Sequence, residues 1–200
     1  MLNTLIAGVG GQGSVLASKI LAQAAQARGW QVRTAETIGM AQRGGNVLGH
    51  VRMGNNGESV YSPLVPLGQA DCIIALEPGE ALRALPYLAP DGLLASSTVG
   101  IPSVVTNLAG QTYDVDAILQ QLQQQVSHFV AVDTQALCHQ AGSPKVLNVG
   151  MLAAAVQASN DQACGLAGAI DVSQLKEALA ACVKPQFLDL NLAAIDAAIR

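Results

Sequence analysis

Short apolar runs alternate along the chain with stretches of helical spacing, and the alternation begins at the first residues. Residues 2–9 form an apolar run that ends in glycines. From Val15 onward the apolar residues recur on one helical face, and Arg28-Gly29 predicts the end of that helix. Residues 30–34 are typical of a second strand. A strand, a glycine turn, a helix and a strand in this order predict a right-handed βαβ unit, and with it a parallel sheet.

The next segment interrupts this alternation. Residues 46–53 alternate with a period of two, which predicts a strand with two unlike faces. One face carries Val47, Val51 and Met53, and the other carries Asn46, His50 and Arg52. Gly54-Asn55-Asn56-Gly57 predicts a tight turn, and Ser59–Ser62 is the candidate return strand. We therefore expect an antiparallel hairpin insert over about 46–62.

The alternation of strands and helices then resumes to the end of the chain. The pattern predicts strands over 70–76, 93–97 and 129–132, and helices over 78–88, 114–126, 133–141, 148–159, 173–183 and 190–199. Pro90-Asp91-Gly92 predicts a turn, and Asp133 and Ser173 are candidate helix caps. The alanine-rich helix over 148–159 is apolar nearly all round, which predicts burial. The sequence has no internal repeat and no linker. We expect a single domain over 1–200, an α/β fold with a Rossmann-like, doubly wound, mostly parallel sheet.

Composition adds a statement about the surface. The chain has 200 residues, of which 50% are hydrophobic and only 12% are charged. Soluble domains carry about 25% charged residues, so this surface is poor in ions. High apolar content with low charge excludes a disordered chain. It also indicates that part of the surface does not face water alone.

Charge and cysteine spacing exclude several classes of function. The net charge is −4 and no basic cluster occurs, so we expect no nucleic-acid partner. No apolar run reaches the ~18 residues of a membrane span, and the N-terminus has no basic region, so we expect neither a membrane helix nor a signal peptide. The four cysteines have no C-x-x-C spacing, so we expect neither a metal site nor a cysteine-ligated cluster within this chain. These features favour a reducing cytoplasm.

A glycine motif follows the first predicted strand. Gly8-Val9-Gly10-Gly11-Gln12-Gly13 matches G-x-G-x-x-G at Gly8, Gly10 and Gly13, between a strand and a helix. Such glycines allow a phosphate to approach the helix N-terminus. Glu36 follows 23 residues after Gly13, near the position of an acidic residue that holds a ribose hydroxyl. The alternative is a glycine turn that only packs the helix against the strand.

A second stretch, over 36–45, is more distinctive. Gln42 and Arg43 stand directly before Gly44 and Gly45, so a flexible backbone carries a fork-shaped cation. Such a loop suits a phosphate or a carboxylate. The alternative is a solvated loop with a surface arginine. Two weaker candidates are His50, which we expect at a surface or an interface, and Glu77, which is either a ligand-facing residue or a helix first-turn acid.

Together these stretches carry a resemblance. The chain resembles the gamma subunit of 2-oxoacid:ferredoxin oxidoreductases, a domain that also forms the beta subunit of indolepyruvate:ferredoxin oxidoreductase. The resemblance extends over nearly the whole chain, and the second stretch is its most specific part. The residues that carry it are Gly8-Val9-Gly10-Gly11-Gln12-Gly13, Ala17-Ser18-Lys19-Ile20-Leu21, Glu36-Thr37-Ile38-Gly39-Met40-Ala41-Gln42-Arg43-Gly44-Gly45, His50-Val51-Arg52 and Asn191-Leu192-Ala193-Ala194.

The resemblance implies a subunit of an oxidoreductase rather than an independent enzyme. In that family a 2-oxoacid is decarboxylated on thiamine diphosphate and passed to coenzyme A, and electrons leave through iron–sulfur clusters to ferredoxin or flavodoxin. It implies that thiamine diphosphate, Mg and the clusters lie on companion subunits. This chain then serves assembly and borders the coenzyme A or substrate site, and no catalytic residue is assigned to it. Alone, it is expected either to form a homodimer or to expose apolar patches larger than those of a typical monomer. The ligand-binding residues expected here are Gly8, Gly10, Gly11, Gln12, Gly13, Glu36, Gln42, Arg43, Gly44 and Gly45.

The residues leave two other functions open. The glycine motif with Glu36 also fits a self-sufficient NAD(P)-dependent dehydrogenase, although no catalytic dyad stands out. A non-catalytic nucleotide-binding module fits the same motif. Both hypotheses require a nucleotide-binding site at the glycine loop.

Overall fold

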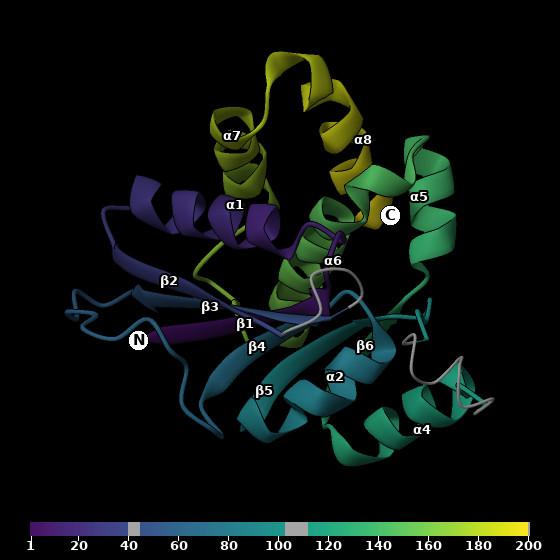
Figure 1. The fold of residues 1–200 in the computed structure, drawn as a ribbon. Coiled ribbons are helices and arrows are strands. Elements are labelled where there is room, and N and C mark those ends of the chain that lie inside the picture. The colour runs from purple at the N-terminus through teal and green to yellow at the C-terminus, as the bar shows by residue number, and fades with distance from the viewer. Residues whose placement is uncertain (40–44, 103–111, 200) are drawn as a thin grey trace.

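The protein is described by a computed structural model that covers residues 1–39, 45–102 and 112–199 (Figure 1). Among these residues, six strands form one mixed sheet in the order β2-β3-β1-β4-β5-β6. The strands are β1 Leu2–Val9, β2 Gln31–Ile38, β3 Asn46–Gly54, β4 Ala70–Ala75, β5 Leu88–Ser97 and β6 His128–Val132. The α-helices are α1 Ser14–Ala27, α2 Pro78–Ala84, α4 Val115–Gln125, α5 Thr134–Ala141, α6 Leu147–Gln162, α7 Val172–Cys182 and α8 Leu188–Ala198. Short 3₁₀ helices cover Leu85–Tyr87, Pro144–Val146 and Pro185–Phe187.

The part of the sheet made of β1, β4, β5 and β6 is parallel, and the part made of β2, β3 and β1 is antiparallel. β1, β4, β5 and β6 are parallel neighbours. β3 is antiparallel to both β1 and β2. β2 therefore runs in the same direction as β1, as the predicted βαβ unit requires, but β3 lies between them. The predicted α/β class with a mostly parallel sheet is confirmed.

The predicted hairpin over 46–62 is wrong in its second strand. The turn forms, with Gly57 N–H donating to the Gly54 carbonyl at 3.3 Å, but Ser59–Ser62 is not a strand. Both edges of β3 are already occupied by β1 and β2, so no return strand has an edge to pair with. The hairpin consists instead of β2 and β3.

Residues 55–69 form an extended strap across the sheet face that carries His50 and Arg52. Arg52 donates to the Ser62 carbonyl at 3.0 Å, and Val65 N–H donates to His50 Nδ1 at 3.2 Å. At the outer end of the strap, Val60 N–H donates to Gln31 Oε1 on β2 at 2.9 Å. The strap thus covers the polar face of β3, while Val47, Val51 and Met53 are buried on the other face, as predicted.

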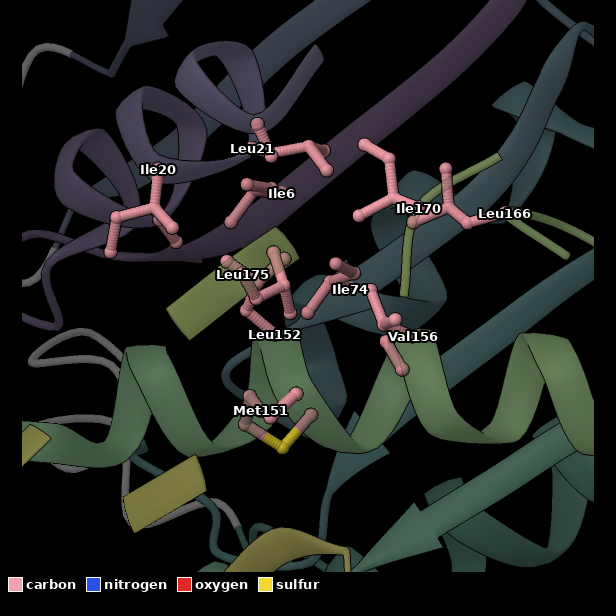
Figure 2. Close-up of a cluster of buried hydrophobic side chains, with 14 of the residues drawn as sticks. Ile6, Ile20, Leu21, Ile74, Met151, Leu152, Val156, Leu166, Ile170 and Leu175 are labelled. Carbon is pink, nitrogen blue, oxygen red and sulfur yellow. The ribbon is translucent and has the colours of Figure 1, made fainter. Parts of the chain in front are cut away.

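Helices cover both faces of the sheet and enclose two cores. α1, α6, α7 and α8 lie on one face, and α2 and α4 lie on the other (Figure 1). Figure 2 shows the larger core, where side chains from α1, α6 and α7 meet those of β1 and β4. The labelled members are Ile6, Ile20, Leu21, Ile74, Met151, Leu152, Val156, Leu166, Ile170 and Leu175. The predicted burial of the helix over 148–159 is confirmed, since α6 carries much of this core.

Three local predictions require correction. Pro90-Asp91-Gly92 is not a turn but part of β5, where Gly92 is packed so closely that a Cβ would lie 2.7 Å from the Ala70 carbonyl. Ser173 does not cap α7; Asp171 does, in a capping box with Gln174. The helix predicted over 78–88 ends at Ala84, and Leu88 already begins β5. The predicted cap at Asp133 is confirmed, as its carboxylate accepts from Ala136 N–H at 2.9 Å.

Candidate functional site

The carboxyl ends of β1 and β4 mark the point where the chain reverses its direction through the sheet. From β1 it crosses to α1 on one face, and from β4 it crosses to α2 on the other. Open α/β sheets bind ligands in the crevice at such a switch point. Here the crevice lies between the loop Gly10–Gly13 and the segment Leu76-Glu77.

The side chain of Gln12 bridges this crevice. Its Oε1 accepts from Val9 N–H at 2.8 Å, and its Nε2 donates to the Leu76 carbonyl at 2.8 Å. A Cβ on Gly8 would lie 2.9 Å from Gln12 Oε1 and 3.2 Å from the Leu76 side chain. Gly8 is therefore required so that the amide can reach across. The Gln12 amide thus bonds across the strand ends at which open α/β sheets bind their ligands.

Gly13 is held from the opposite side by α6. Gly13 adopts a left-handed conformation (φ 82°) directly before α1. Asn148 Nδ2 donates to its carbonyl at 2.9 Å, and a Cβ on Gly13 would lie 2.7 Å from that nitrogen. The sequence motif does not reveal Asn148, whose one signal is that it is a polar residue at the start of an apolar helix. Two of the three motif glycines thus have packing roles.

The structure brings the glycine loop to the second predicted stretch. Gly10 N–H donates to the Gly45 carbonyl at 2.9 Å, and Gly39 N–H donates to the Asn46 carbonyl at 2.8 Å. Gly45 therefore lies on the glycine loop. The predicted residues Gln42, Arg43 and Gly44 lie outside the described residues.

Glu36 lies apart from this loop. In the sheet register it is opposite Gly49 of β3, which in turn is opposite Ile6 of β1. Two strand spacings, about 10 Å, therefore separate Glu36 from β1. In the dinucleotide arrangement the strand with the acidic residue is the direct neighbour of β1. Glu36 lines instead a groove between α1 and β2, together with Lys19.

Glu77 is a helix cap whose carboxylate is fully engaged. Its Oε2 accepts from Glu80 N–H at 2.9 Å, and its Oε1 accepts from Ile101 N–H at 3.2 Å and from the Tyr113 hydroxyl. Gly79 N–H donates to the same hydroxyl at 2.9 Å. Burial, followed by the Glu77 carboxylate, raises the pKa of Tyr113. The first-turn role of Glu77 is therefore the one that the contacts support.

His50 is buried, and the expectation of a surface or interface histidine is wrong. The strap covers it, so only 3% of the residue is exposed. Its ring meets that of Tyr87 edge-on, with centroids 6.2 Å apart. Burial lowers the pKa of His50 below 6.5. A neutral ring is required because Nδ1 accepts the hydrogen bond from Val65.

A cavity of about 750 Å³ lies beyond the carboxyl ends of β5 and β6, a feature that the sequence did not indicate. Thr134 lines it, and the Thr134 hydroxyl shares a hydrogen bond of 2.7 Å with the hydroxyl of buried Ser97. The lining residues are Val99, Thr134, Gln135, Cys138, His139, Gly142, Ser143, Pro144 and Leu147. Within residues 1–39, 45–102 and 112–199, no three His, Cys, Asp or Glu side chains group closely enough to hold a metal ion. No helix of this part of the chain has the length and apolarity to cross a membrane.

Comparison with known proteins places the chain among oxidoreductase subunits. A sequence model described as pyruvate ferredoxin/flavodoxin oxidoreductase matches residues 3–200. Indolepyruvate oxidoreductase subunit IorB of Archaeoglobus fulgidus is 37% identical over 198 residues, which cover 97% of this chain and 92% of that protein. The subunit of the same name from Thermococcus kodakarensis is 34% identical over 200 residues, covering 99% and 94%.

Solved structures show the same fold at lower identity. The gamma subunit of a keto/oxoacid ferredoxin oxidoreductase from Geobacter sulfurreducens has a TM-score of 0.68 at 21% identity, covering 100% of this chain and 96% of that one. A 2-oxoglutarate:ferredoxin oxidoreductase from Magnetococcus marinus, solved with 2-oxoglutarate, coenzyme A and succinyl-CoA, has a TM-score of 0.65 at 20% identity. The match covers 98% of this chain but 30% of that longer chain.

Proposed function

The chain belongs to the pyruvate ferredoxin/flavodoxin oxidoreductase family, and we propose that it is the small, non-autonomous subunit of an indolepyruvate-type 2-oxoacid:ferredoxin oxidoreductase. The observation that carries the proposal is the match over almost the full length of subunits named for indolepyruvate, at 34–37% identity. The substrate class is thus an aryl 2-oxoacid. The electron acceptor is ferredoxin or flavodoxin, and the setting is the cytoplasm.

The geometry of the switch point argues against the dehydrogenase and the nucleotide-binding module. A dinucleotide site needs an open glycine loop and an acidic residue on the strand next to β1. Here Gln12 bonds across the crevice at the glycine loop, and β3 separates Glu36 from β1.

The residues of this chain do not fit an iron–sulfur cluster. The four cysteines lie on β4, α5, the turn after α6 and α7, and Cys72 is fully buried. Cluster ligands need thiolates that converge on one point. We therefore assign the clusters, like thiamine diphosphate with its Mg, to companion subunits. Thiamine diphosphate would supply the decarboxylation on those subunits.

The part of the chain that we assign to the coenzyme A or substrate site is the edge formed by the glycine loop and the 39–45 segment. The hydrogen bond from Gly10 to Gly45 joins the two, and the N-terminus of α1 adds a positive dipole end. We propose that Gly11, together with Gln42, Arg43 and Gly44 of the sequence before Gly45, binds an anion held by a companion subunit. Gly8 and Glu36 stand outside this edge.

The test is reconstitution. We expect the purified chain alone to reduce neither ferredoxin nor a viologen dye with any 2-oxoacid. Combined with companion subunits that bear thiamine diphosphate and clusters, it should support coenzyme A-dependent reduction with indolepyruvate in preference to pyruvate, 2-oxoglutarate or 2-oxoisovalerate. Turnover by the chain alone would contradict the subunit role, and a preference for pyruvate would contradict the substrate class.

A further inference from the structure

Among the described residues, the sheet ends at β2, an eight-residue strand whose outer edge pairs with no other strand. β2 pairs with β3 along its whole length, from Gln31 opposite Gly54 to Ile38 opposite Val47, without a register shift. On its other side, no strand of the described residues pairs with it, and each of its residues is exposed or half-buried. It contains neither proline nor a bulge, two of the features with which proteins block a free edge. β2 can therefore accept a further strand.

The face of β2 toward α1 has apolar ends and a polar middle. Thr34 and Glu36 line the groove against α1. Because strand side chains alternate, Val32 and Ile38 share that face. Ile38 exposes 65% of its surface, which is unusual for a large apolar side chain at a regular strand position.

We propose that β2 pairs antiparallel with β2 of a second copy of this chain about a twofold axis at Ala35, so that one sheet continues through a homodimer. A twofold axis normal to the sheet leaves every side chain on the same face of the sheet. Residues that lie opposite each other in a strand pair point to the same face, while neighbours along a strand point to opposite faces. The residue at the axis must therefore lie opposite its own counterpart in the second copy. About Ala35, Val32 lies opposite Ile38 of the second copy, and Thr34 lies opposite Glu36. The apolar ends then cover each other, and a small residue occupies the axis.

The neighbouring registers are less favourable. An axis at Arg33 or at Glu36 would place that charge opposite itself, which destabilises a strand pair. An axis at Thr34 would place Val32 opposite Glu36. The Ala35 register alone, among these four, pairs apolar with apolar and opposes no like charges.

The groove beside β2 supports the same arrangement. It has a volume of about 320 Å³, and Lys19, Gln23 and Gln26 of α1 line it at helical spacing. Among the strands, α1 packs most on β3 and β2, above which it lies in Figure 1, so two α1 helices would lie about 10 to 14 Å apart across the axis. At that separation the long amides reach each other, and Lys19 reaches Glu36 of the second copy. On the face toward α1, each copy contributes Lys19 and Glu36, so the charges on that face balance; Arg33 lies on the other face, where this register places it opposite Thr37 of the second copy.

This self-complementarity favours a second copy over a strand of a companion subunit. The proposal does not rest on the proposed function, since it concerns the chain alone. Its test begins with sedimentation equilibrium on the purified full chain. We expect a mass twice the 20.5 kDa of one chain. Ala35→Arg, which opposes two like charges at the axis, should raise the dimer dissociation constant at least tenfold, and Ala35→Gln should raise it much less.

Cross-linking tests the register itself. In a background with Cys138, Cys164 and Cys182 replaced by serine, Ala35→Cys should be joined to its counterpart by a short bismaleimide. Thr37→Cys on the same strand face is the matched control, because its counterpart would be four residues away along the strand, about 13 Å. A monomer by sedimentation, or equal cross-linking of both variants, would overturn the proposal. Protection of Ala35→Cys only after companion subunits are added would also overturn it, because the occupant would then be a companion strand.

Discussion

At the scale of single residues, His50 ties protonation to folding. Its ring is buried under the strap, and Nδ1 accepts the hydrogen bond from Val65. Burial lowers the pKa of folded His50, while the unfolded residue titrates near 6.5. Between these two values the unfolded state binds more protons, so the free energy of unfolding rises with pH and falls on acidification.

We therefore expect urea titrations to show a loss of stability as the pH is lowered through 6.5. His50→Gln, whose amide oxygen can accept from Val65 N–H, should show a flatter dependence in this range. The matched control is His128→Gln, since His128 lies on β6 away from the strap. Parallel pH dependences for the wild type and His50→Gln would show that His50 does not carry the effect.

The proposed anion-facing edge makes Arg43 the residue to replace. Loss of a charge-assisted hydrogen bond costs about 1.5–3 kcal/mol, so Arg43→Ala should raise the KM for coenzyme A in the assembled complex roughly tenfold or more. Arg43→Lys keeps the charge but loses the forked guanidinium, so its KM for coenzyme A should lie between those of the wild type and Arg43→Ala. The thermal midpoint of the isolated chain serves as the control for folding. Unchanged kinetics in both variants would assign Arg43 to a solvated loop.

Gln12 shows why the glycine motif could be found in the sequence while its role could not. The motif predicts correctly a tight turn between β1 and α1. The role of the motif depends on contacts with residues that are distant in sequence, since Leu76 is 64 residues from Gln12 and Asn148 is 135 residues from Gly13. Local spacing contains no information about such contacts.

At the scale of elements, the ends of helices were harder to predict than their existence. The apolar periodicity of the helix over 173–183 is correct, but its cap lies two residues earlier than expected. Asp171 accepts from Gln174 N–H at 2.8 Å, and Gln174 Oε1 accepts from Asp171 N–H at 3.0 Å. Ser173 is a residue within the first turn, and both Ser and Asp fit the cap preference.

Asp171→Ala should therefore lower the free energy of unfolding by about 1 kcal/mol, because it leaves N-terminal amide groups of α7 without a partner. Ser173→Ala, the matched control in the same turn, should change it by no more than about 0.5 kcal/mol. Chemical denaturation of the two variants measures both effects. An equal loss in both variants would mean that the capping box is not a stabilising feature.

β3 illustrates the same limit for strands. Its alternating pattern predicted the strand and both of its faces correctly, yet its partners were assigned wrongly. The hairpin prediction used the strongest local turn, Gly54–Gly57, but that turn leads into the strap. Strand pairing is decided by which edges are free in the assembled sheet, and β1 and β2 occupy both edges of β3. The strap then buries the face that looked polar.

At the scale of the whole molecule, the position of β3 decides between a nucleotide-binding and an assembly role. The order β2-β3-β1 places one strand between the two that hold a dinucleotide in a Rossmann fold. The composition fits the second role, because only 12% of the residues are charged.

This order yields a prediction for the isolated chain. Titration calorimetry with NADH or NADPH should give no binding heat, because Gln12 bonds across the crevice and Glu36 lies about 10 Å from β1. Gln12→Ala opens the crevice but leaves Glu36 two strands away, so it should not create a dinucleotide site. It should instead lower the thermal midpoint, since the Leu76 carbonyl and Val9 N–H each lose a partner. Micromolar NADH binding by the wild type would mean that the amide bridge gives way to a ligand, and would restore the dehydrogenase hypothesis.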